Sequence, residues 1–224
     1  MLLSEIKGIG EKRVLALNKQ GFFTPLDLLY FFPYAYVDTR TPCDARACAD
    51  GQAIFVRGTV ADKSFRYLRK GLTMVRARLK TEYGDVHCTW FNQKYITAAL
   101  EGEIGVYGTV EHFKSTVSLK APVLIREDGI VPLYRPLKGV PSNVLKSALA
   151  AVFRRVTVKS VIPDTLTAAF GLPALNDCFR QLHFPTDVEQ AETARRAIEI
   201  DRLAYELACF RLLKARKVPA PRAY

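Results

Sequence analysis

No hydrophobic run in the sequence approaches the roughly 20 apolar residues that a membrane span needs. The N-terminus, MLLSEIKGIG, also lacks the basic start and long apolar stretch of a secretory signal. The five cysteines have no regular spacing, which argues against a disulfide framework and favours a reducing, cytoplasmic compartment. We therefore expect no membrane partner.

Patterns for metal binding and nucleophilic catalysis are missing as well. Cys43 and Cys48 are not paired with further ligands at the spacing of a zinc site. Cys178 and His183 are the residue types of a nucleophile and its base, but the sequence places no orienting third group beside them. We expect no metal and no catalytic residue in this chain, and we expect His183 to be a hydrogen-bonded packing residue.

Acidic residues are in the minority. The chain has 22 Asp and Glu against 33 Lys and Arg, a net charge of +11, which points to a polyanionic partner. A solvated surface face is the alternative explanation for a local excess of cations. Between positions 63 and 80 there is no acid, and the cations are Lys63, Arg66, Arg69, Lys70, Arg76, Arg78 and Lys80.

The sequence divides into three parts, which we take as residues 1–48, 49–128 and 129–224. The first and third have helical periodicity, and the second is rich in strand patterns. The third part is expected to hold a helix over 144–156, shorter helices near 164–166 and 174–179, and a long helix over 189–217. The apolar face of the long helix is made of Ile198, Leu203, Leu207, Phe210 and Leu213.

The first part contains a pattern, Ile-Lys-Gly-Ile-Gly, that resembles a helix-hairpin-helix element. In such elements glycine lets the backbone approach a phosphate at a helix N-terminus, so Gly8, Gly10 and Lys12 are candidate phosphate contacts. The alternative is that the glycines only close a short helical connection. A second helix is expected to begin at Thr24, with Pro25 in its first position.

The second part predicts a five-stranded barrel. Strand patterns cover 53–60, 72–79 and 86–91, a short helix follows at 94–100, and two more strands cover 104–110 and 116–124. Three strands, a helix and two strands is the order of an OB-fold. Gly58 and Gly108 fall within strands, where glycine marks a bulge or bend. The fold class is therefore α+β, an OB-fold barrel flanked by helical segments.

An aromatic pair follows the third strand of this barrel. OB-folds that bind single-stranded nucleic acid stack bases on aromatic side chains while cations follow the phosphates. Phe91 ends the strand and Tyr95 lies four residues later, with Lys94 between them, so the two rings are candidates for one rim. The alternative is that one of them fills the core. Trp90, Phe55 and Met74 are expected in the core.

Several short motifs occur in a fixed order along nearly the whole length of the sequence. They are Ile6–Gly10, Asp27–Tyr36, Phe91–Tyr95, Val131–Tyr134 with Gly139, Leu182–Pro185 and Ala194–Arg196. In their order and spacing these motifs resemble the N-terminal portion of the RecG family of ATP-dependent branched-DNA helicases.

The resemblance implies that the barrel is a wedge placed at the branch point of a replication fork. Phe91 and Tyr95 would stack on the template bases that flank the junction, and Asn92, Gln93 and Lys94 would line the same rim. The cations from position 63 to 80 would hold the fork arms through salt-sensitive contacts. The family role is replication fork regression, Holliday junction processing, DNA recombination and repair. Branched DNA is the implied partner, and the protein would act as a monomer on the bacterial nucleoid.

The family's motor is absent from this sequence. No Gly is followed by Lys, so there is no Gly-x-x-x-x-Gly-Lys-Ser/Thr phosphate loop. ATP and Mg would bind the motor domains, which the long C-terminal helix would join in cis, and this chain would supply recognition and strand separation without catalysis. A smaller departure is Lys120–Val123, which replaces the family's usual ending of the last barrel strand.

Two other functions fit the same residues. The first is a generic OB-fold binder of single-stranded nucleic acid with no preference for branches. The second is a protein-interaction module that docks a partner or a second copy on the apolar face of the long helix.

Overall fold

The computed structural model describes residues 2–68 and 71–215. The chain forms two compact units, one made of Met1–Ala35 together with Pro132–Tyr224 and the other of Tyr36–Val131. The helical ends of the sequence therefore belong to one unit, and the strand-rich middle forms the other. The predicted α+β class is confirmed, while the three-part division at residues 48 and 128 stays a prediction.

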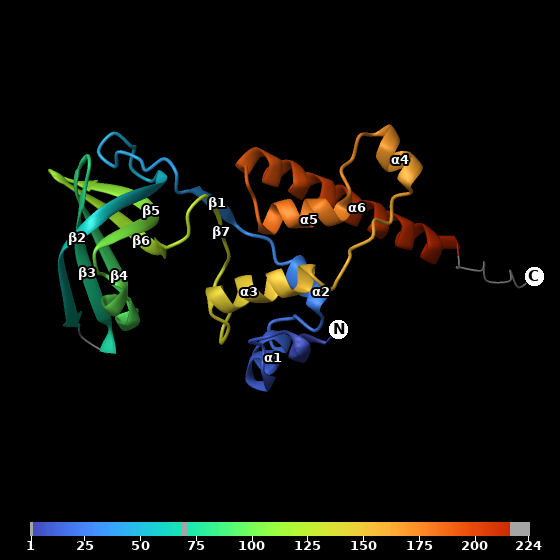
Figure 1. The fold of residues 1–224 in the computed structure, drawn as a ribbon, viewed down its shortest axis with the longest axis horizontal. Coiled ribbons are helices and arrows are strands. Elements are labelled where there is room, and N and C mark those ends of the chain that lie inside the picture. The colour runs from blue at the N-terminus through green and yellow to red at the C-terminus, as the bar shows by residue number, and fades with distance from the viewer. Residues whose placement is uncertain (1, 69–70, 216–224) are drawn as a thin grey trace, which may run out of the picture. The chain divides into compact units, whose positions relative to one another are not determined.

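Five strands of the second unit close into a barrel (Figure 1). Their order is β2-β3-β4-β6-β5, and all neighbours are antiparallel except β4 and β6, which pair in parallel at two positions. A short 3-10 helix, η3, follows the third strand, so the predicted OB-fold is confirmed. The elements are β2 (Ala53–Tyr67), β3 (Thr73–Thr81), β4 (Gly84–Phe91), η3 (Lys94–Ala99), β5 (Glu103–Phe113) and β6 (Thr116–Ile125).

Alternate residues of the strands fill the barrel, as the two-residue period of a strand requires. In β3, Val75 and Ala77 are buried in the interior, and in β4 Trp90 is only 1% exposed. Phe55 and Met74 are buried too, at 3% and 6% exposure, so the predicted burial of the three large side chains is confirmed, although only Trp90 belongs to the cluster that fills the barrel.

Two glycines occupy positions where neighbouring strands lie too close for a side chain. A Cβ on Gly58 would lie 2.7 Å from the carbonyl oxygen of Lys80, and one on Gly108 would lie 3.1 Å from a carbonyl oxygen of β6. The strand register shifts between Val60 and Asp62 in β2 and at Gly108 in β5. The predicted irregularity is therefore confirmed at Gly108, whereas Gly58 pairs regularly with Ile104 and serves the close approach of Lys80.

The last barrel strand contains a bulge at the segment that departs from the family pattern. Pairing with β5 jumps from Lys120 to Val123, and Ala121 has a left-handed backbone with φ of 47°. The Pro122 carbonyl accepts a hydrogen bond of 2.6 Å from Nε1 of the buried Trp90. The bulged main chain therefore places a carbonyl oxygen where the buried indole needs an acceptor.

Two short strands form a separate sheet where the chain passes between the units. β1 (Ala35–Asp38) pairs with β7 (Ile130–Leu133). Beside them, Thr39 and Gly129 exchange backbone and side-chain hydrogen bonds of 2.9 to 3.1 Å. Pro132 and Leu133 therefore belong to a strand.

The first unit is helical, and its second helix begins as the sequence predicts. Asp27 N donates to Thr24 Oγ1 at 3.3 Å, and Asp27 Oδ2 accepts from Thr24 N at 2.8 Å, which is a capping box with Pro25 in the first turn. The elements are η1 (Leu3–Glu5), α1 (Glu11–Asn18), α2 (Pro25–Leu29), α3 (Ser142–Phe153), α4 (Asp164–Ala169), α5 (Leu175–His183) and α6 (Val188–Ala215).

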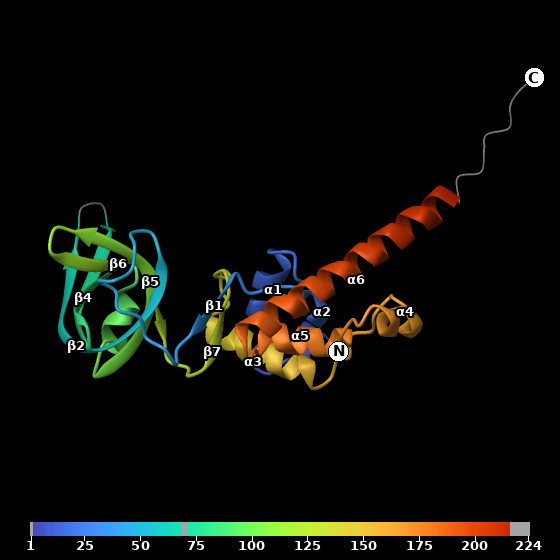
Figure 2. The same cartoon turned by 90° about the horizontal axis from the view of Figure 1, so that it is seen from above.

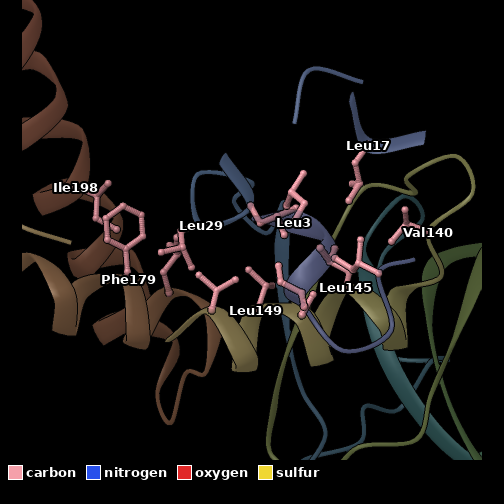
Figure 3. Close-up of a cluster of buried hydrophobic side chains, with 14 of the residues drawn as sticks. Leu3, Leu17, Leu29, Val140, Leu145, Leu149, Phe179 and Ile198 are labelled. Atoms are coloured by element: carbon pink, nitrogen blue, oxygen red, sulfur yellow. The ribbon is translucent and has the colours of Figure 1, made fainter. Parts of the chain in front are cut away.

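One hydrophobic cluster joins the two ends of the sequence in this unit (Figure 3). Leu17 and Leu29 come from the N-terminal helices, Leu149 from α3, Phe179 from α5 and Ile198 from α6, and each is at most 1% exposed. Residues far apart in sequence therefore share one core, which makes the N-terminal helices dependent on the C-terminal ones.

His183 is a packing residue inside this cluster, as expected. Its Nε2 donates to the Leu29 carbonyl at 2.7 Å, so its Nδ1 accepts the 2.8 Å hydrogen bond from the Tyr134 hydroxyl. Its ring also stacks on Tyr134 with an interplanar angle of 10°. Burial lowers the pKa of His183 to about 4, although the Leu29 carbonyl acts in the opposite direction. The imidazole is therefore neutral in the folded protein near pH 7.

The long helix α6 is packed only in its first half, and its end extends past α5 (Figure 2). Ala191, Ala194 and Ile198 are at most 1% exposed. The large apolar side chains that follow Asp201 are all more than half exposed, namely Leu203, Tyr205, Leu207, Phe210, Leu212 and Leu213. Of the apolar face expected on this helix, only Ile198 is covered by described residues. In the described parts of the chain, no helix is long and apolar enough to cross a bilayer.

We predict that acid destabilises the helical unit through His183. The unfolded imidazole, with a pKa of about 6.5, takes up a proton before the buried one does, so stability falls as pH decreases from 7 towards 4. This one group should cost about 2 kcal/mol of unfolding free energy between pH 7 and pH 5. Urea unfolding followed by circular dichroism at the two pH values measures the loss.

The variant His183→Gln should lose much less stability over the same pH interval. The matched control is His112→Gln, which replaces a histidine of the barrel and should retain the wild-type pH dependence of helix unfolding. An equal pH dependence in wild type and His183→Gln would contradict the prediction.

Candidate nucleic-acid interface

The two candidate stacking residues are exposed at one end of the barrel. Because Trp90 points inward, the alternation of β4 places Phe91 on the outer face, where it is 51% exposed. Tyr95, in η3, is 75% exposed. Neither side chain fills the core.

The residues between these aromatics hold the turn that carries them. Asn92 has a left-handed backbone with φ of 57°, which Asn tolerates better than most residues. Its N–H donates to the Thr73 carbonyl at 2.9 Å, and its Oδ1 accepts from Thr73 N at 3.1 Å. Gln93 Oε1 accepts a 3.0 Å hydrogen bond from the Tyr95 hydroxyl. The turn after β4 is thus pinned to β3, and the Tyr95 ring is tied at its outer end.

Lys94 lies over an aromatic ring at this end of the barrel. Its Nζ is 5.6 Å from the ring centroid of Phe65, within the range of a cation–π contact. Phe65 in turn makes an edge contact with Tyr67 at 4.8 Å between centroids, and Tyr67 is 70% exposed. The sequence pattern alone does not single out Tyr67, although its place among the cations of β2 is a signal of the same kind.

Two of the cations between positions 63 and 80 are engaged with other protein groups. Lys63 Nζ donates to the Leu100 carbonyl at 3.0 Å and lies 3.3 Å from Glu101 Oε1, at the end of η3. Arg78 forms a 2.8 Å ion pair with Asp85, and this hydrogen bond holds the pKa of the Asp85 carboxyl below its usual range. Both residues therefore have structural roles in the barrel.

Two other cations of this set lie on the same outer face as Phe91. In the strand register, Arg66 is beside Met74, which is beside Phe91, and Arg76 lies two residues further along β3. Arg66 and Arg76 are both exposed. Arg69 and Lys70 lie outside the described residues. The sequence run thus separates into cations used within the barrel and cations left on its surface.

The candidate phosphate contacts near the N-terminus lie in the helical unit. Gly8 has φ of 90° and its carbonyl accepts a hydrogen bond from Arg13, while Gly10 caps α1. Lys12 is exposed in the first turn of α1. Ile9, between the glycines, is 2% exposed and belongs to the hydrophobic cluster. The glycines therefore close a tight connection, and whether they also contact phosphate stays a prediction.

Phe113 is a second exposed aromatic that the sequence analysis did not select. It ends β5, is 71% exposed, and has Lys114 Nζ 5.7 Å from its ring centroid. An aromatic directly before a lysine at the start of a two-residue hairpin connection would have been the signal in the sequence.

The residues considered for nucleophilic catalysis are buried, and those considered for metal binding lie apart. Cys178 is fully buried, and burial raises the pKa of its thiol to about 11, which keeps the sulfur protonated. His183 uses both ring nitrogens on Tyr134 and Leu29. Across residues 2–68 and 71–215, no three His, Cys, Asp or Glu side chains gather as a metal site.

The sequence and the fold match those of known proteins. The family model described as RecG wedge domain matches residues 3–159. The ATP-dependent DNA helicase RecG of Streptococcus pneumoniae is 25% identical over 95% of this chain and 32% of its own length, and that of Thermotoga maritima is 26% identical over 89% and 26%. The chain thus spans a third or less of the length of these relatives.

A solved structure of RecG bound to a three-way DNA junction shares the fold. It matches 91% of this chain and 29% of its own with a TM-score of 0.66 and 24% sequence identity. The likeness extends over both units of the chain and supports the architecture described above.

Proposed function

Because the chain belongs to the RecG wedge domain family, we propose that it is a module that binds branched DNA and keeps its strands apart. It would serve a helicase that regresses replication forks and processes Holliday junctions in recombination and repair, acting on the bacterial nucleoid. In such a protein, ATP and Mg would bind the motor domains. The chain described here would contribute recognition of the junction.

The proposal rests on one observation, the exposure of Phe91 and Tyr95 on a turn that is fixed to the barrel. A base pair that opens at a junction loses the stacking of its bases. An exposed aromatic ring replaces that stacking, at about 1–3 kcal/mol per base. Because Asn92 and Gln93 hold the turn, little side-chain order has to be gained when DNA binds. Aromatic rings on a rigid support suit a strand-separating wedge.

Cations near these rings would bind the phosphates of the fork arms. Arg66 and Arg76 are exposed on the outer face next to Phe91, and we assign Arg69, Lys70 and Lys94 the same role. Lys63 and Arg78 would first have to exchange their contacts within the barrel, so we expect a smaller contribution from them. Gly8, Gly10 and Lys12 would offer a further phosphate contact in the helical unit.

We predict that Phe91→Ala together with Tyr95→Ala weakens binding to a three-way junction far more than binding to plain duplex. Loss of one or two stacked bases should lower junction affinity by about tenfold or more. Fluorescence anisotropy with labelled junction and duplex measures both. The matched control is Tyr83→Ala, an exposed aromatic in the turn between β3 and β4, which should leave both affinities unchanged.

Equal losses on junction and duplex would contradict the wedge role. If the unmodified chain instead prefers single-stranded DNA to forked DNA in direct competition, the generic single-strand binder would be the better description.

Replacing cations of the run between positions 63 and 80 should act on all DNA substrates alike. The triple variant Arg66→Ala, Arg69→Ala and Lys70→Ala should reduce the slope of log K against log salt by up to about 2.7 on duplex DNA, because each phosphate contact releases condensed counterions. The control is Arg78→Ala, which removes a cation already paired with Asp85 and should change the slope less. An unchanged slope in the triple variant would make these residues a solvated face.

The exposed second half of α6 is the surface that we assign to the motor domains. Its uncovered side chains include Leu207 and Phe210, which are 55% and 65% exposed. We predict that RecG motor domains supplied in trans bind the chain and that Leu207→Asp with Phe210→Asp abolishes this binding in calorimetry. Binding that survives the substitutions would contradict the assignment. Self-association in sedimentation without DNA, removed by the same substitutions, would assign the surface to a second copy.

A further inference from the structure

The end of β4 that carries Phe91 is held differently on its two sides. On one side, β4 pairs with β3 along its whole length, up to Phe91 beside Met74. On the other side, the parallel ladder with β6 ends at Cys88 and Leu119. Phe91 lies about 10 Å past the end of that ladder, since each residue of a strand advances about 3.3 Å. Past the ladder, a link between β4 and β6 has to come from side chains.

The indole of Trp90 supplies that link. Its Nε1 donates a hydrogen bond of 2.6 Å to the Pro122 carbonyl, across the seam between β4 and β6. Trp90 is 1% exposed and Pro122 is buried, so water does not compete for either group. A buried carbonyl that loses its donor is costly, because nothing replaces the lost hydrogen bond. The bond therefore fixes the seam one residue before Phe91.

The acceptor is held in place by the bulge in β6. Pairing of β6 with β5 passes from Lys120 to Val123, and Ala121 between them has a left-handed backbone with φ of 47°. This backbone is unfavourable for alanine, so the surrounding contacts have to hold it. It turns the chain so that the Pro122 carbonyl faces the buried indole. The bulge and the tryptophan thus act together to close the seam.

We infer that Trp90 is a positioning residue for the proposed wedge, because its N–H, through the Pro122 carbonyl, fixes the strand end from which Phe91 meets the bases at a junction. A ring on a strand end that can shift away from β6 would have to be ordered when DNA binds, which lowers affinity. The turn at Asn92 is tied to Thr73 of β3, so it moves with that strand and does not replace the link to β6. The inference rests on the proposed function and adds to it the contact that orients its stacking ring.

The first experiment removes the donor and keeps the shape of the side chain. The chain has one tryptophan, so Trp90→benzothienylalanine, in which sulfur replaces the indole N–H, changes the full 224-residue chain at this position alone. We expect affinity for a three-way junction to fall about threefold to tenfold and affinity for plain duplex to stay the same, since a loosened Phe91 has to be ordered on binding. The Tm of the barrel should fall by about 4–8 °C. Fluorescence anisotropy of labelled DNA and thermal unfolding followed by circular dichroism measure the two effects.

Leu79→Ala is the matched control for stability. Leu79 is fully buried in the same barrel and lies on β3, which is not part of the seam. Its truncation leaves a cavity and should lower the Tm at least as far. The ratio of junction affinity to duplex affinity should nevertheless stay at the wild-type value. A purely structural role of Trp90 would make the two variants alike in this ratio.

The second experiment breaks the same hydrogen bond from the acceptor side. Ala121 is exposed, so its substitution leaves the core unchanged. Ala121→Val should reduce the junction preference as the loss of the indole N–H does, because a β-branched residue is strongly disfavoured in the left-handed backbone. Ala121→Gly, which favours that backbone, should retain the preference. Added to Trp90→benzothienylalanine, Ala121→Val should have little further effect, since both remove one interaction.

The single indole also reports the hydrogen bond without DNA. In a proton–nitrogen correlation spectrum it gives one side-chain N–H signal. Exchange of this proton with solvent should be slow in the unmodified chain, because the bond is buried, and about tenfold or more faster in Ala121→Val.

Wild-type junction preference in both Trp90→benzothienylalanine and Ala121→Val would overturn the inference, and so would rapid exchange of the indole N–H in the unmodified chain. If Phe91→Ala with Tyr95→Ala abolishes junction preference while these variants retain it, the wedge stands without a positioning role for Trp90. If the unmodified chain has no junction preference and its indole exchanges slowly, the proposed function fails, and the Trp90 hydrogen bond is left with a structural role alone.

Discussion

The buried indole of Trp90 is the constraint on which the barrel and its exposed rim both depend. β4 and β6 close the barrel through a parallel ladder of only two residue pairs. The hydrogen bond from Trp90 Nε1 to the Pro122 carbonyl adds a third link between the same strands. Because side chains alternate along a strand, fixing Trp90 inward places Phe91 outward. Barrel closure and exposure of the rim are therefore consequences of one side-chain orientation.

The cations between positions 63 and 80 divide into those that bind other groups of the barrel and those that remain exposed on its surface. Lys63 donates a hydrogen bond to a carbonyl at the end of η3, and Arg78 forms an ion pair with Asp85. Neither cation is therefore free to bind a polyanion. Arg66 and Arg76 are left on the face that also carries Phe91. In the proposed function, recognition of a junction would come from this small set of free cations and aromatic rings. The net charge of +11 would attract DNA of any form without distinguishing a junction from a plain duplex.

Much of the fold could be predicted from the sequence because it follows from local chemistry. The helix cap at Thr24 depends only on the residues beside it. The strand that contains Gly58 is recognised from the alternation of apolar residues, and the close approach at Gly58 follows from its lack of a side chain. The burial of Trp90 was predicted from the same pattern. Phe113 was missed because its relevance depends on a groove formed by three other strands. The unequal roles of Lys63 and Arg66 were missed because the groups that bind Lys63, Leu100 and Glu101, lie at the end of η3, far along the chain.

The sequence by itself indicated the succession of strands along the chain and the identity of the residues in the turn after β4, since each depends on neighbours within a few positions. The tertiary structure decided that neither Phe91 nor Tyr95 fills the core. Only the tertiary structure decided that residues from both ends of the chain share one helical core. It also decided which cations remain free, and it placed Phe113, from the hairpin between β5 and β6, in the lining of the same groove as Arg76. The physical reason is that burial and ion pairing are set by contacts between segments, and a linear pattern does not contain those distances.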